Sequence, residues 1–508
     1  MYKTIVGLEV HVELDTKSKM FCSCANDPDE HHPNVNICQI CTAQPGSLPV
    51  INKEAVRKTI KTGLALNCQI PEYSKFDRKN YFYPDLPKGY QISQLYEPLC
   101  INGYLEIGDK KIRIREVHLE EDTGKLIHPE GENYSLVDFN RAGIPLMELV
   151  TEPDMNSAKE TRKFAEELHL IMHYLNVSDA DMEKGQMRVE VNVSLSPKGK
   201  PAPYRTEGSG AGLGTKVEIK NLNSFRAVQR AIEYEIQRQT KILESGKKVI
   251  QETRGWLDET TVSSRRVAGA RVDDVKGVTV SQREKEEAHD YRYFPEPDLP
   301  PLHNTKEFVN KIRAEIPELS RQRRERLAKE YKLDKKSIEV FVQNKDFGEY
   351  FEKVISELPP KIPKNQLPRL IKLATNYLIT DLQGLLKGAS VTGEDFLITA
   401  ENFAEFITLI EEGKISSKIA KMVLSEMFST GADPSHIIEE KGLSQITDEA
   451  EIEKIIKEVI SKNPKAVEDF KKGKENAFQY LIGQIMAKTR GKANPQIVKD
   501  ILSKTLTP

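Results

Sequence analysis

Two closely spaced pairs of cysteines lie near the N-terminus of the 508-residue chain. Cys22 and Cys24 form the first pair, and Cys38 and Cys41 form the second. Thiolates bind Zn²⁺ tetrahedrally, and two short loops with this spacing can supply four sulfur ligands. Because a closed four-sulfur site leaves no position for a substrate, the pattern predicts structural rather than catalytic zinc. The alternative is four ordinary cysteines, some of them buried.

Carboxylates recur on segments that have a strand pattern. Three segments alternate between apolar and polar side chains, as strands do when one face lies on a core. They are residues 4–14, 187–195 and 215–221. Their polar faces carry Glu9, His11, Glu190 and Glu218. The segment 117–122 adds three consecutive acids, which are Glu120, Glu121 and Asp122.

Such a set of carboxylates could bind Mg²⁺, which prefers hard oxygen ligands together with water and phosphate. A bound Mg²⁺ neutralises charge on a phosphoryl group during transfer. A single glutamate of this kind is more commonly a solvated surface residue, but the repetition on three strands favours a shared acidic cavity. We find no Walker A loop and no kinase signature, and the glycine-rich stretch 208–214 lacks the lysine of a phosphate loop. Any ATP site therefore requires an unusual fold.

The elements that must position these residues fall into a strand-rich part followed by a helical part. Two helices interrupt the strand-rich part, one starting after the capping-box pattern of Ser157 and Glu160 and one after Ser224. A proline cluster at 295–301 closes this part, and a second change of composition lies near Ala400. We therefore predict an α+β fold with a mixed or antiparallel sheet, followed by helical domains.

Bulk composition excludes several classes of protein. Hydrophobic residues make up 38% of the chain and charged residues 30%, as in soluble globular proteins, and the length predicts more than one domain. No apolar run has the length of a membrane span and no signal peptide is evident, so we expect a cytoplasmic protein. The net charge of −2 gives no global attraction for nucleic acid, so any RNA contact must come from local patches.

A longer motif is too specific for composition to explain. Residues 137–149, VDFNRAGIPLMEL, resemble the signature of the B subunit of the aspartyl/glutamyl-tRNA amidotransferases. Further segments that resemble this family are 5–14, 75–85, 118–122, 216–224, 290–298, 415–421 and 491–495. The chain departs from the family around 198–212 and 261–282, where it has what we expect to be surface loop extensions.

The resemblance implies a fold and a division into domains. It implies a cradle-shaped kinase and transamidase domain with the zinc knuckle over residues 1–295. A helical domain over 296–400 and a small helical tRNA-binding tail over 401–508 follow. Some members of the family lack the cysteine pairs, so the resemblance also implies that zinc is not needed for the chemistry.

The resemblance also implies an activity. The family are ligases that convert Glu-tRNA(Gln) or Asp-tRNA(Asn) into Gln-tRNA(Gln) or Asn-tRNA(Asn), with ATP and Mg²⁺. A carboxylate does not accept ammonia usefully because oxide would have to leave, whereas an acyl phosphate can lose phosphate. A glutaminase A subunit supplies the ammonia and a small C subunit completes the heterotrimer.

Individual residues match the family's site. Glu9, His11 and Glu121 match its Mg²⁺ ligands, and Glu190 is expected beside them. Residues expected at the nucleotide are Tyr81, Asn192, Glu218 and Asn221. Candidates for phosphate or carboxylate contacts are Lys79, Arg141 and Lys220, for which surface ion pairs are the alternative.

The tail carries two basic sets beside Phe478 and Tyr480. They are Lys471, Lys472, Lys474, Lys488, Arg490 and Lys492. Phosphate contacts of this kind are salt-sensitive and independent of sequence, and the family's tail favours tRNA binding over a solvated helix face. Two other functions stay open: a non-catalytic tRNA-binding scaffold subunit, and a zinc-dependent hydrolase, which a closed four-cysteine site disfavours.

Overall fold

The computed structural model describes most of the chain. It leaves out residues 1, 28, 130, 198–203, 206–211, 259–276, 285–289, 360–362, 364, 447, 473, 490, 507 and 508. The predicted loop extensions at 198–212 and 261–282 lie largely outside the described residues, and so does Arg490. The chain divides into two compact units, Met1–Ser320 and Arg321–Pro508.

An eight-stranded sheet forms the centre of the first unit, with the strand order β15-β14-β13-β10-β1-β9-β6-β5. Its strands are β1 (Tyr2–Glu13), β5 (Cys100–Ile107), β6 (Lys110–Glu121), β9 (Pro145–Thr151), β10 (Met187–Pro197), β13 (Val217–Leu222), β14 (Glu252–Leu257) and β15 (Val278–Glu284). Only the pairing of β13 with β14 is parallel. The mixed sheet and the helices around it confirm the predicted α+β fold.

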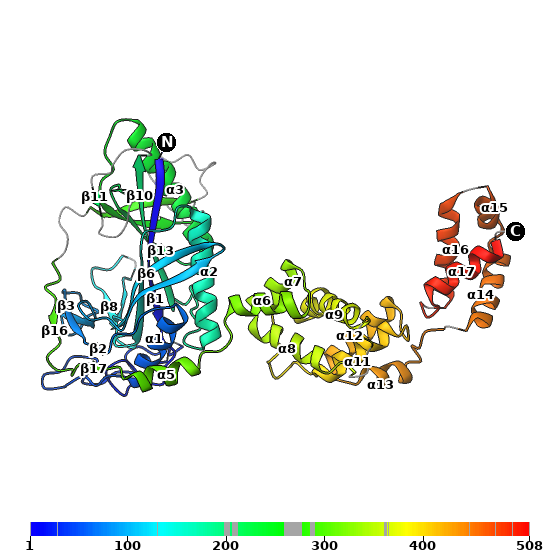
Figure 1. The fold of residues 1–508 in the computed structure, drawn as a ribbon, viewed down its shortest axis with the longest axis horizontal. Helices are drawn as coiled ribbons and strands as arrows, with labels where there is room; N and C mark the ends of the chain where they lie inside the picture. Colours follow the sequence, from blue (N-terminus) through cyan, green and yellow to red (C-terminus); the bar gives the residue numbers. More distant parts are fainter. Residues whose placement is uncertain are drawn as a thin grey trace. The chain divides into compact units, whose positions relative to one another are not determined.

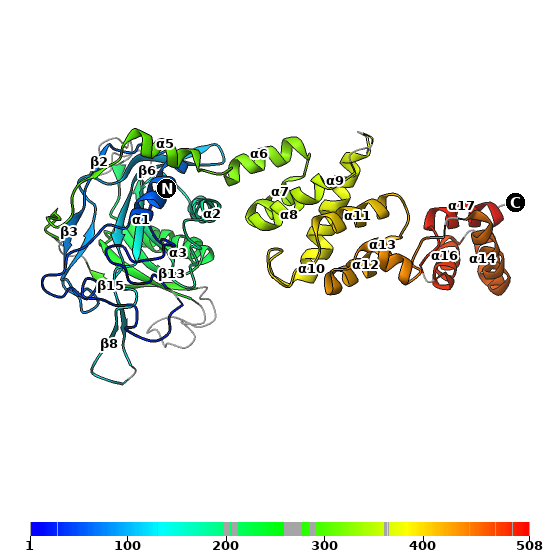
Figure 2. The ribbon, with the colours of Figure 1, turned by 90° about the horizontal axis from the view of Figure 1, so that it is seen from below.

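Three helices cover one face of this sheet (Figures 1 and 2). They are α1 (Lys53–Ala65), α2 (Ala158–Leu175) and α3 (Phe225–Glu244). The apolar face of β1, from Val6 to Val12, is buried in the core that these helices share with the sheet. Ser157 and Ser224 accept hydrogen bonds from backbone amides of the first turns of α2 and α3, so both predicted N-caps are confirmed.

The polar face of the sheet looks the other way, toward a small three-stranded sheet. This sheet consists of β3 (Asp77–Asn80), β4 (Tyr90–Ser93) and β16 (Phe294–Pro295). The backbone amide of Ile92 on β4 and the side chain of Gln91 both donate to Glu121 at the end of β6. The remaining short elements are β2 (Tyr73–Ser74), β7 (Lys125–Ile127), β8 (Leu136–Asp138), β11 (Tyr204–Arg205), β12 (Gly212–Leu213), β17 (Leu302–His303) and α5 (Lys306–Ala314).

The regular elements of the second unit are all helices in its described residues. Its helices are α6 (Ser320–Glu330), α7 (Lys335–Gln343), α8 (Lys345–Ser356), α9 (Leu367–Asn376), the π-helix η2 (Tyr377–Leu382), α10 (Gln383–Leu386), α11 (Ala400–Glu411), α12 (Ser417–Thr430), α13 (Pro434–Glu440), α14 (Glu449–Lys462), α15 (Pro464–Lys471), α16 (Glu475–Lys488) and α17 (Pro495–Leu506). Helices α14 to α17 enclose a hydrophobic cluster of their own, around Ile456 and Ile485.

The first unit ends at Ser320, beyond the predicted cradle boundary at 295, because β17 and α5 still pack on it. The division of the helical half near residue 400 stays a prediction. Among the described residues, no helix combines the length and the apolar character needed to cross a bilayer.

A buried lysine ties α1 to the end of α2. Lys58 donates from Nζ to the carbonyl oxygens of Asp15, Asn176 and Val177, and the latter two distances are 3.1 and 3.5 Å. We predict that Lys58→Met lowers the free energy of unfolding by about 1–3 kcal/mol, because the buried carbonyl of Val177 and the two partly buried carbonyls lose their donor. Urea unfolding of the full chain measures this. The exposed Lys53→Met on the same helix is the control, and an equal effect of both changes would contradict the account.

Candidate functional site

A cavity of about 870 Å³ lies between the polar face of the large sheet and β3. Almost all the residues that line it have polar or charged groups. The acids and the histidine that line it are Glu9, His11, Glu120, Asp122, Glu148, Glu190 and Glu218. The basic residues are Lys79, Arg141, Arg188, Lys216 and Lys220, and the tyrosines are Tyr81, Tyr83, Tyr291 and Tyr293.

The strand register forces three carboxylates together at one end of this cavity. Glu9 on β1 lies directly opposite Glu190 on β10, and Glu218 on β13 is one strand further along. One ligand oxygen from each lies within 4.8 Å of the others. Like charges that face each other across strands destabilise a sheet, so this arrangement favours a bound cation.

A second group forms on the neighbouring strands. Glu148 on β9 is paired with His11 on one side and with His118 on β6 on the other. The distance from a Glu148 carboxylate oxygen is 3.4 Å to His11 Nε2 and 3.3 Å to His118 Nε2. Glu120 joins them, since its carboxylate lies 3.5 Å from His11 Nε2. His11, Glu120 and Glu148 therefore offer three ligand atoms within 4.8 Å of one another.

Neighbouring charges shift the pKa values of His11 and Glu148 in the second group. Burial disfavours a charged His11, but Glu148, Glu120 and Glu190 outweigh burial and raise the pKa of His11 to about 9. Burial also opposes ionisation of Glu148, yet the two imidazoles hold the pKa of Glu148 well below its usual range. A cation bound here would replace the proton of His11, because metals bind the neutral imidazole.

Basic side chains complete the cavity. Lys220 Nζ lies 2.8 Å from a carboxylate oxygen of Glu190. Lys79 Nζ lies over the ring of Tyr291 in a cation–π contact. Burial would lower the pKa of Lys79, but Glu120 and the other nearby acids raise it, so Lys79 stays charged. Arg141 donates to the carbonyl oxygens of Thr123 and Gly124 at 3.0 and 2.8 Å.

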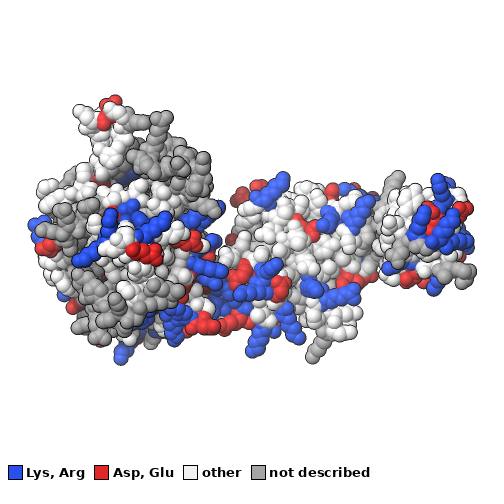
Figure 3. Space-filling model, turned by 90° about the horizontal axis from the view of Figure 1, so that it is seen from above, with Lys and Arg blue, Asp and Glu red and all other residues white. Residues whose placement is uncertain are grey.

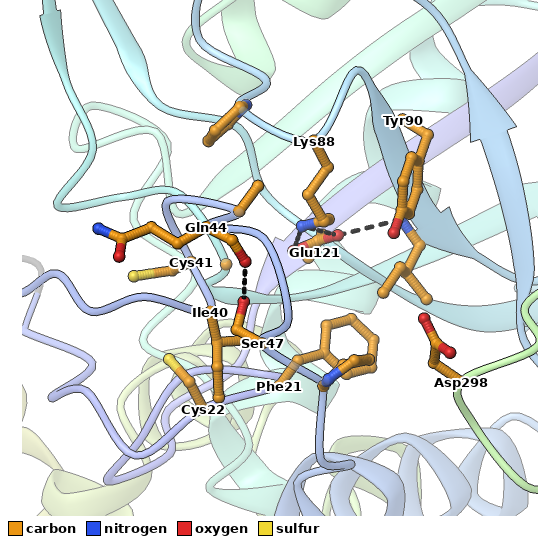
Figure 4. Close-up of a pocket in the computed structure, with 15 residues that line it drawn as sticks. Phe21, Cys22, Ile40, Cys41, Gln44, Ser47, Lys88, Tyr90, Glu121 and Asp298 are labelled. Carbon is orange, nitrogen blue, oxygen red and sulfur yellow. Dashed lines mark hydrogen bonds and ion pairs between the residues drawn. The ribbon is translucent and has the colours of Figure 1, made fainter.

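The structure does not bring Glu121 to Glu9 and His11, contrary to the prediction from the sequence. Because side chains alternate along β6, Glu120 faces the cavity and Glu121 points to the opposite side. Glu121 there pairs with Lys88 at 2.7 Å and lines a second pocket of about 230 Å³ beside Cys41 (Figure 4). Of the two adjacent acids, Glu120 therefore lines the cavity and the predicted Glu121 does not.

The residues predicted to contact the nucleotide also differ in whether they line the cavity. Tyr81 lines the cavity, and Glu218 accepts a hydrogen bond from Thr253 at 2.6 Å. Asn192 donates to Glu9 at 2.8 Å, whereas its Oδ1 is buried and has no hydrogen-bond partner in the described part of the chain. Asn221 has a left-handed backbone with φ of 61°, is exposed, and is not among the residues that line the cavity.

Several residues that line the cavity were not predicted from the sequence. Glu148 is the one acid in the otherwise apolar stretch 144–150, and an isolated acid in a buried strand is a signal that could have found it. Arg188 precedes Glu190 on the polar face of β10 and pairs with Asp122 at 2.8 Å. Tyr291 and Tyr293 come from the connection between β15 and β16, and no periodicity in the sequence connects them to the cavity.

The four N-terminal cysteines converge as predicted for a metal site. Their sulfur atoms all lie within 4.8 Å of one another. The Sγ–Sγ distances are 4.0 Å from Cys24 to Cys41 and 3.9 Å from Cys38 to Cys41. Zinc–sulfur bonds of about 2.3 Å require sulfurs about 3.8 Å apart in a tetrahedron, so the donor set fits zinc with little movement.

The tail lysines lie largely in ion pairs. Lys474 pairs with Asp469 at 2.9 Å, and Lys472 pairs with Glu468 at 3.9 Å. Lys488 contacts Glu458. Lys471 is exposed and Lys492 is half-buried. On the face drawn in Figure 3, basic and acidic side chains alternate over this part of the chain, so the basic sets are less uniform than the sequence suggested.

Comparisons with known proteins give the class of protein to which this fold and cavity belong. A family described as the GatB/GatE catalytic domain matches residues 4–310, and one described as the GatB domain matches residues 349–506. The chain is 49% identical to the B subunit of the aspartyl/glutamyl-tRNA(Asn/Gln) amidotransferase of Caldicellulosiruptor saccharolyticus, over 99% of each chain. It is 45% identical to the corresponding protein of Thermotoga maritima and 48% identical to that of Persephonella marina, also over 99% of each chain.

The chain belongs to the GatB family of tRNA amidotransferase subunits. The resemblance seen in its sequence motifs is thereby confirmed. Membership gives it the role of a subunit in a complex that carries out tRNA transamidation.

We predict that the purified chain retains one equivalent of zinc and that Cys38→Ser loses it, because three sulfurs no longer close the site. Cys68→Ala, which removes a buried cysteine outside the cluster, should retain the metal. Elemental analysis of the dialysed proteins measures the content. Full zinc in Cys38→Ser, or none in the wild type, would contradict the assignment.

Proposed function

We propose that this chain activates the side-chain carboxylate of a misacylated Glu-tRNA(Gln) or Asp-tRNA(Asn) with ATP and then amidates it, inside the cavity of the first unit. The observation that supports this most strongly is the convergence of two groups of potential cation ligands, around Glu9 and around Glu148, beside the lysines of one cavity. Such a cavity suits transfer of a phosphoryl group between two negatively charged partners.

The reaction needs no protein nucleophile. A carboxylate oxygen of the substrate attacks the γ-phosphorus of ATP, and ADP leaves with the electron pair of the broken bond. Ammonia then attacks the carbonyl carbon of the acyl phosphate, loses a proton, and phosphate leaves to give the amide. The protein must hold the two substrates in line and compensate the charge that accumulates on phosphate.

The residues present fit a divalent cation in both groups. Each group offers three ligand atoms, and the unpartnered acceptor Oδ1 of Asn192 lies on the side chain that donates to Glu9. His11, Glu120 and Glu148 would hold one Mg²⁺, and Glu9, Glu190 and Glu218 would hold a second. Mg²⁺ would neutralise phosphate charge and polarise the bond to the leaving oxygen.

The basic residues and tyrosines of the cavity would contact the phosphates, the substrate carboxylate and the nucleotide. Lys79 and Lys220 would contact phosphate oxygens or the substrate carboxylate, since both line the cavity. Tyr81 and Arg141 line the same space and would orient the nucleotide or the aminoacyl end. The cysteine cluster would hold structural zinc, because four thiolates leave no position for a substrate.

Ammonia and tRNA require further surfaces. Ammonia would come from a glutaminase A subunit, with a small C subunit completing the heterotrimer, because the sequence has no recognisable glutaminase signature.

The tail would hold the tRNA backbone through Lys471, Lys472, Lys474, Lys488, Arg490 and Lys492. The exposed ring of Tyr480 lies beside Lys474 in a pocket of about 480 Å³ and could stack on a base. A non-catalytic tRNA scaffold is the alternative function.

We predict that Glu148→Gln lowers the rate of ATP- and ammonia-dependent amidation by about 100-fold or more, because the central carboxylate of one cation group is lost. The assay uses the complex with its partner subunits, free ammonia, and both Glu-tRNA and Asp-tRNA. Glu106→Gln, on the outer strand β5 and outside the cavity, is the matched control. Undiminished activity of Glu148→Gln would favour the scaffold function.

We predict that replacing Lys471, Lys472 and Lys474 together by Glu weakens tRNA binding at least about 10-fold. The salt dependence of the affinity should also become less steep, because fewer counterions are released. Filter binding at several salt concentrations measures both effects. A double change of the exposed Lys499 and Lys504 on α17 to Glu serves as the control, and equal losses would argue for a general charge effect.

A further inference from the structure

Helix α2 carries two histidines that none of the roles above uses. His169 and His173 are four residues apart and therefore lie on the same face of the helix, on successive turns. Their Nε2 atoms are 3.2 Å apart, and their ring planes are inclined by 64°. Both side chains are half-buried, so solvent reaches them. His169 also packs against the ring of Phe225, the first residue of α3.

The distance between the two nitrogens suits a shared ligand. Two imidazoles can share one proton between their Nε2 atoms, but only if one ring is the donor and the other the acceptor. A metal ion binds both lone pairs at once. With bonds of about 2.05 Å to nitrogen, two ligands lie about 2.9 Å apart in an octahedral site and about 3.4 Å apart in a tetrahedral one. The observed 3.2 Å falls between these values, so the ion needs little rearrangement.

The surroundings favour binding of a metal cation over protonation of the two imidazoles. Burial is the main cause that lowers the pKa of both rings, to about 4 for His169, so both are neutral in neutral solution. Neutral imidazole is the form that binds metals. Asp179 and Asp181 add negative potential at the pair. His173 also lies in the last turn of α2, where the helix dipole favours positive charge.

We propose that His169 and His173 form a transition-metal site on α2, separate from the cysteine cluster and from the cavity. Its ligand is a borderline divalent ion such as Ni²⁺, Zn²⁺ or Cu²⁺, held through two Nε2 atoms with water completing the coordination. Imidazole nitrogen suits these ions, whereas Mg²⁺ prefers oxygen. The bound ion links two successive turns at the C-terminal end of α2 and is structural, because the helix packs on the sheet face opposite to the cavity.

The test is calorimetric titration of the full-length chain with Ni²⁺ after the cysteine cluster has been loaded with zinc. The wild type should bind one further ion, and His169→Gln and His173→Gln should each weaken that binding at least about 10-fold, because a chelate becomes a single ligand. Glutamine preserves the size and the helix propensity of the site, so both variants should fold. Circular dichroism checks this.

The control is His436→Gln, which removes a histidine from α13 and should leave the titration unchanged. Ni²⁺ should also raise the thermal midpoint of the wild type more than that of either α2 variant, since the ion binds the folded helix. Equal Ni²⁺ affinity in the wild type and both α2 variants would overturn the proposal. Loss of all binding on alkylation of the cysteines alone would overturn it as well.

Discussion

The antiparallel pairing of β1 with β10 on one side and β9 on the other is the constraint on which the site depends. In this register Glu9 faces Glu190, and His11 lies beside Glu148. A shift of one residue in either pairing would turn every charged side chain of β1 into the core and every valine into the cavity. The apolar face, buried to 0–1% exposure from Val6 to Val12, therefore holds the polar face in position.

The energy of the apolar core is what allows so many like charges to gather. Burial of an unpaired carboxylate is costly, and the sheet places two groups of them on adjacent strands. Lysines, histidines and an asparagine amide offset part of the charge, and the proposed cations would offset the rest. The sheet also keeps two donor sets apart, since soft thiolates converge at one place and hard carboxylates at another.

Sequence reasoning predicted the fold class, both helix caps and the polar faces of three strands, because these follow from local periodicity and capping chemistry. It selected Glu121 through the family resemblance, although the alternation of Val117 and Leu119 with His118 and Glu120 at the end of β6 places Glu120 on the polar face. It also missed Glu148 as a partner of His11, because cross-strand register is a property of the whole sheet. The tyrosines of 291–293 reach the cavity only through tertiary packing.

The central claim is that the substrate carboxylate becomes an acyl phosphate in this cavity. It is tested most directly with Glu-tRNA whose side-chain carboxylate carries ¹⁸O, incubated with the complex, ATP, Mg²⁺ and ammonia. The account predicts that the inorganic phosphate released contains one ¹⁸O atom from the substrate for each amide formed. Unlabelled phosphate alongside full amide formation would contradict the account and show that ATP is cleaved without activating the carboxylate.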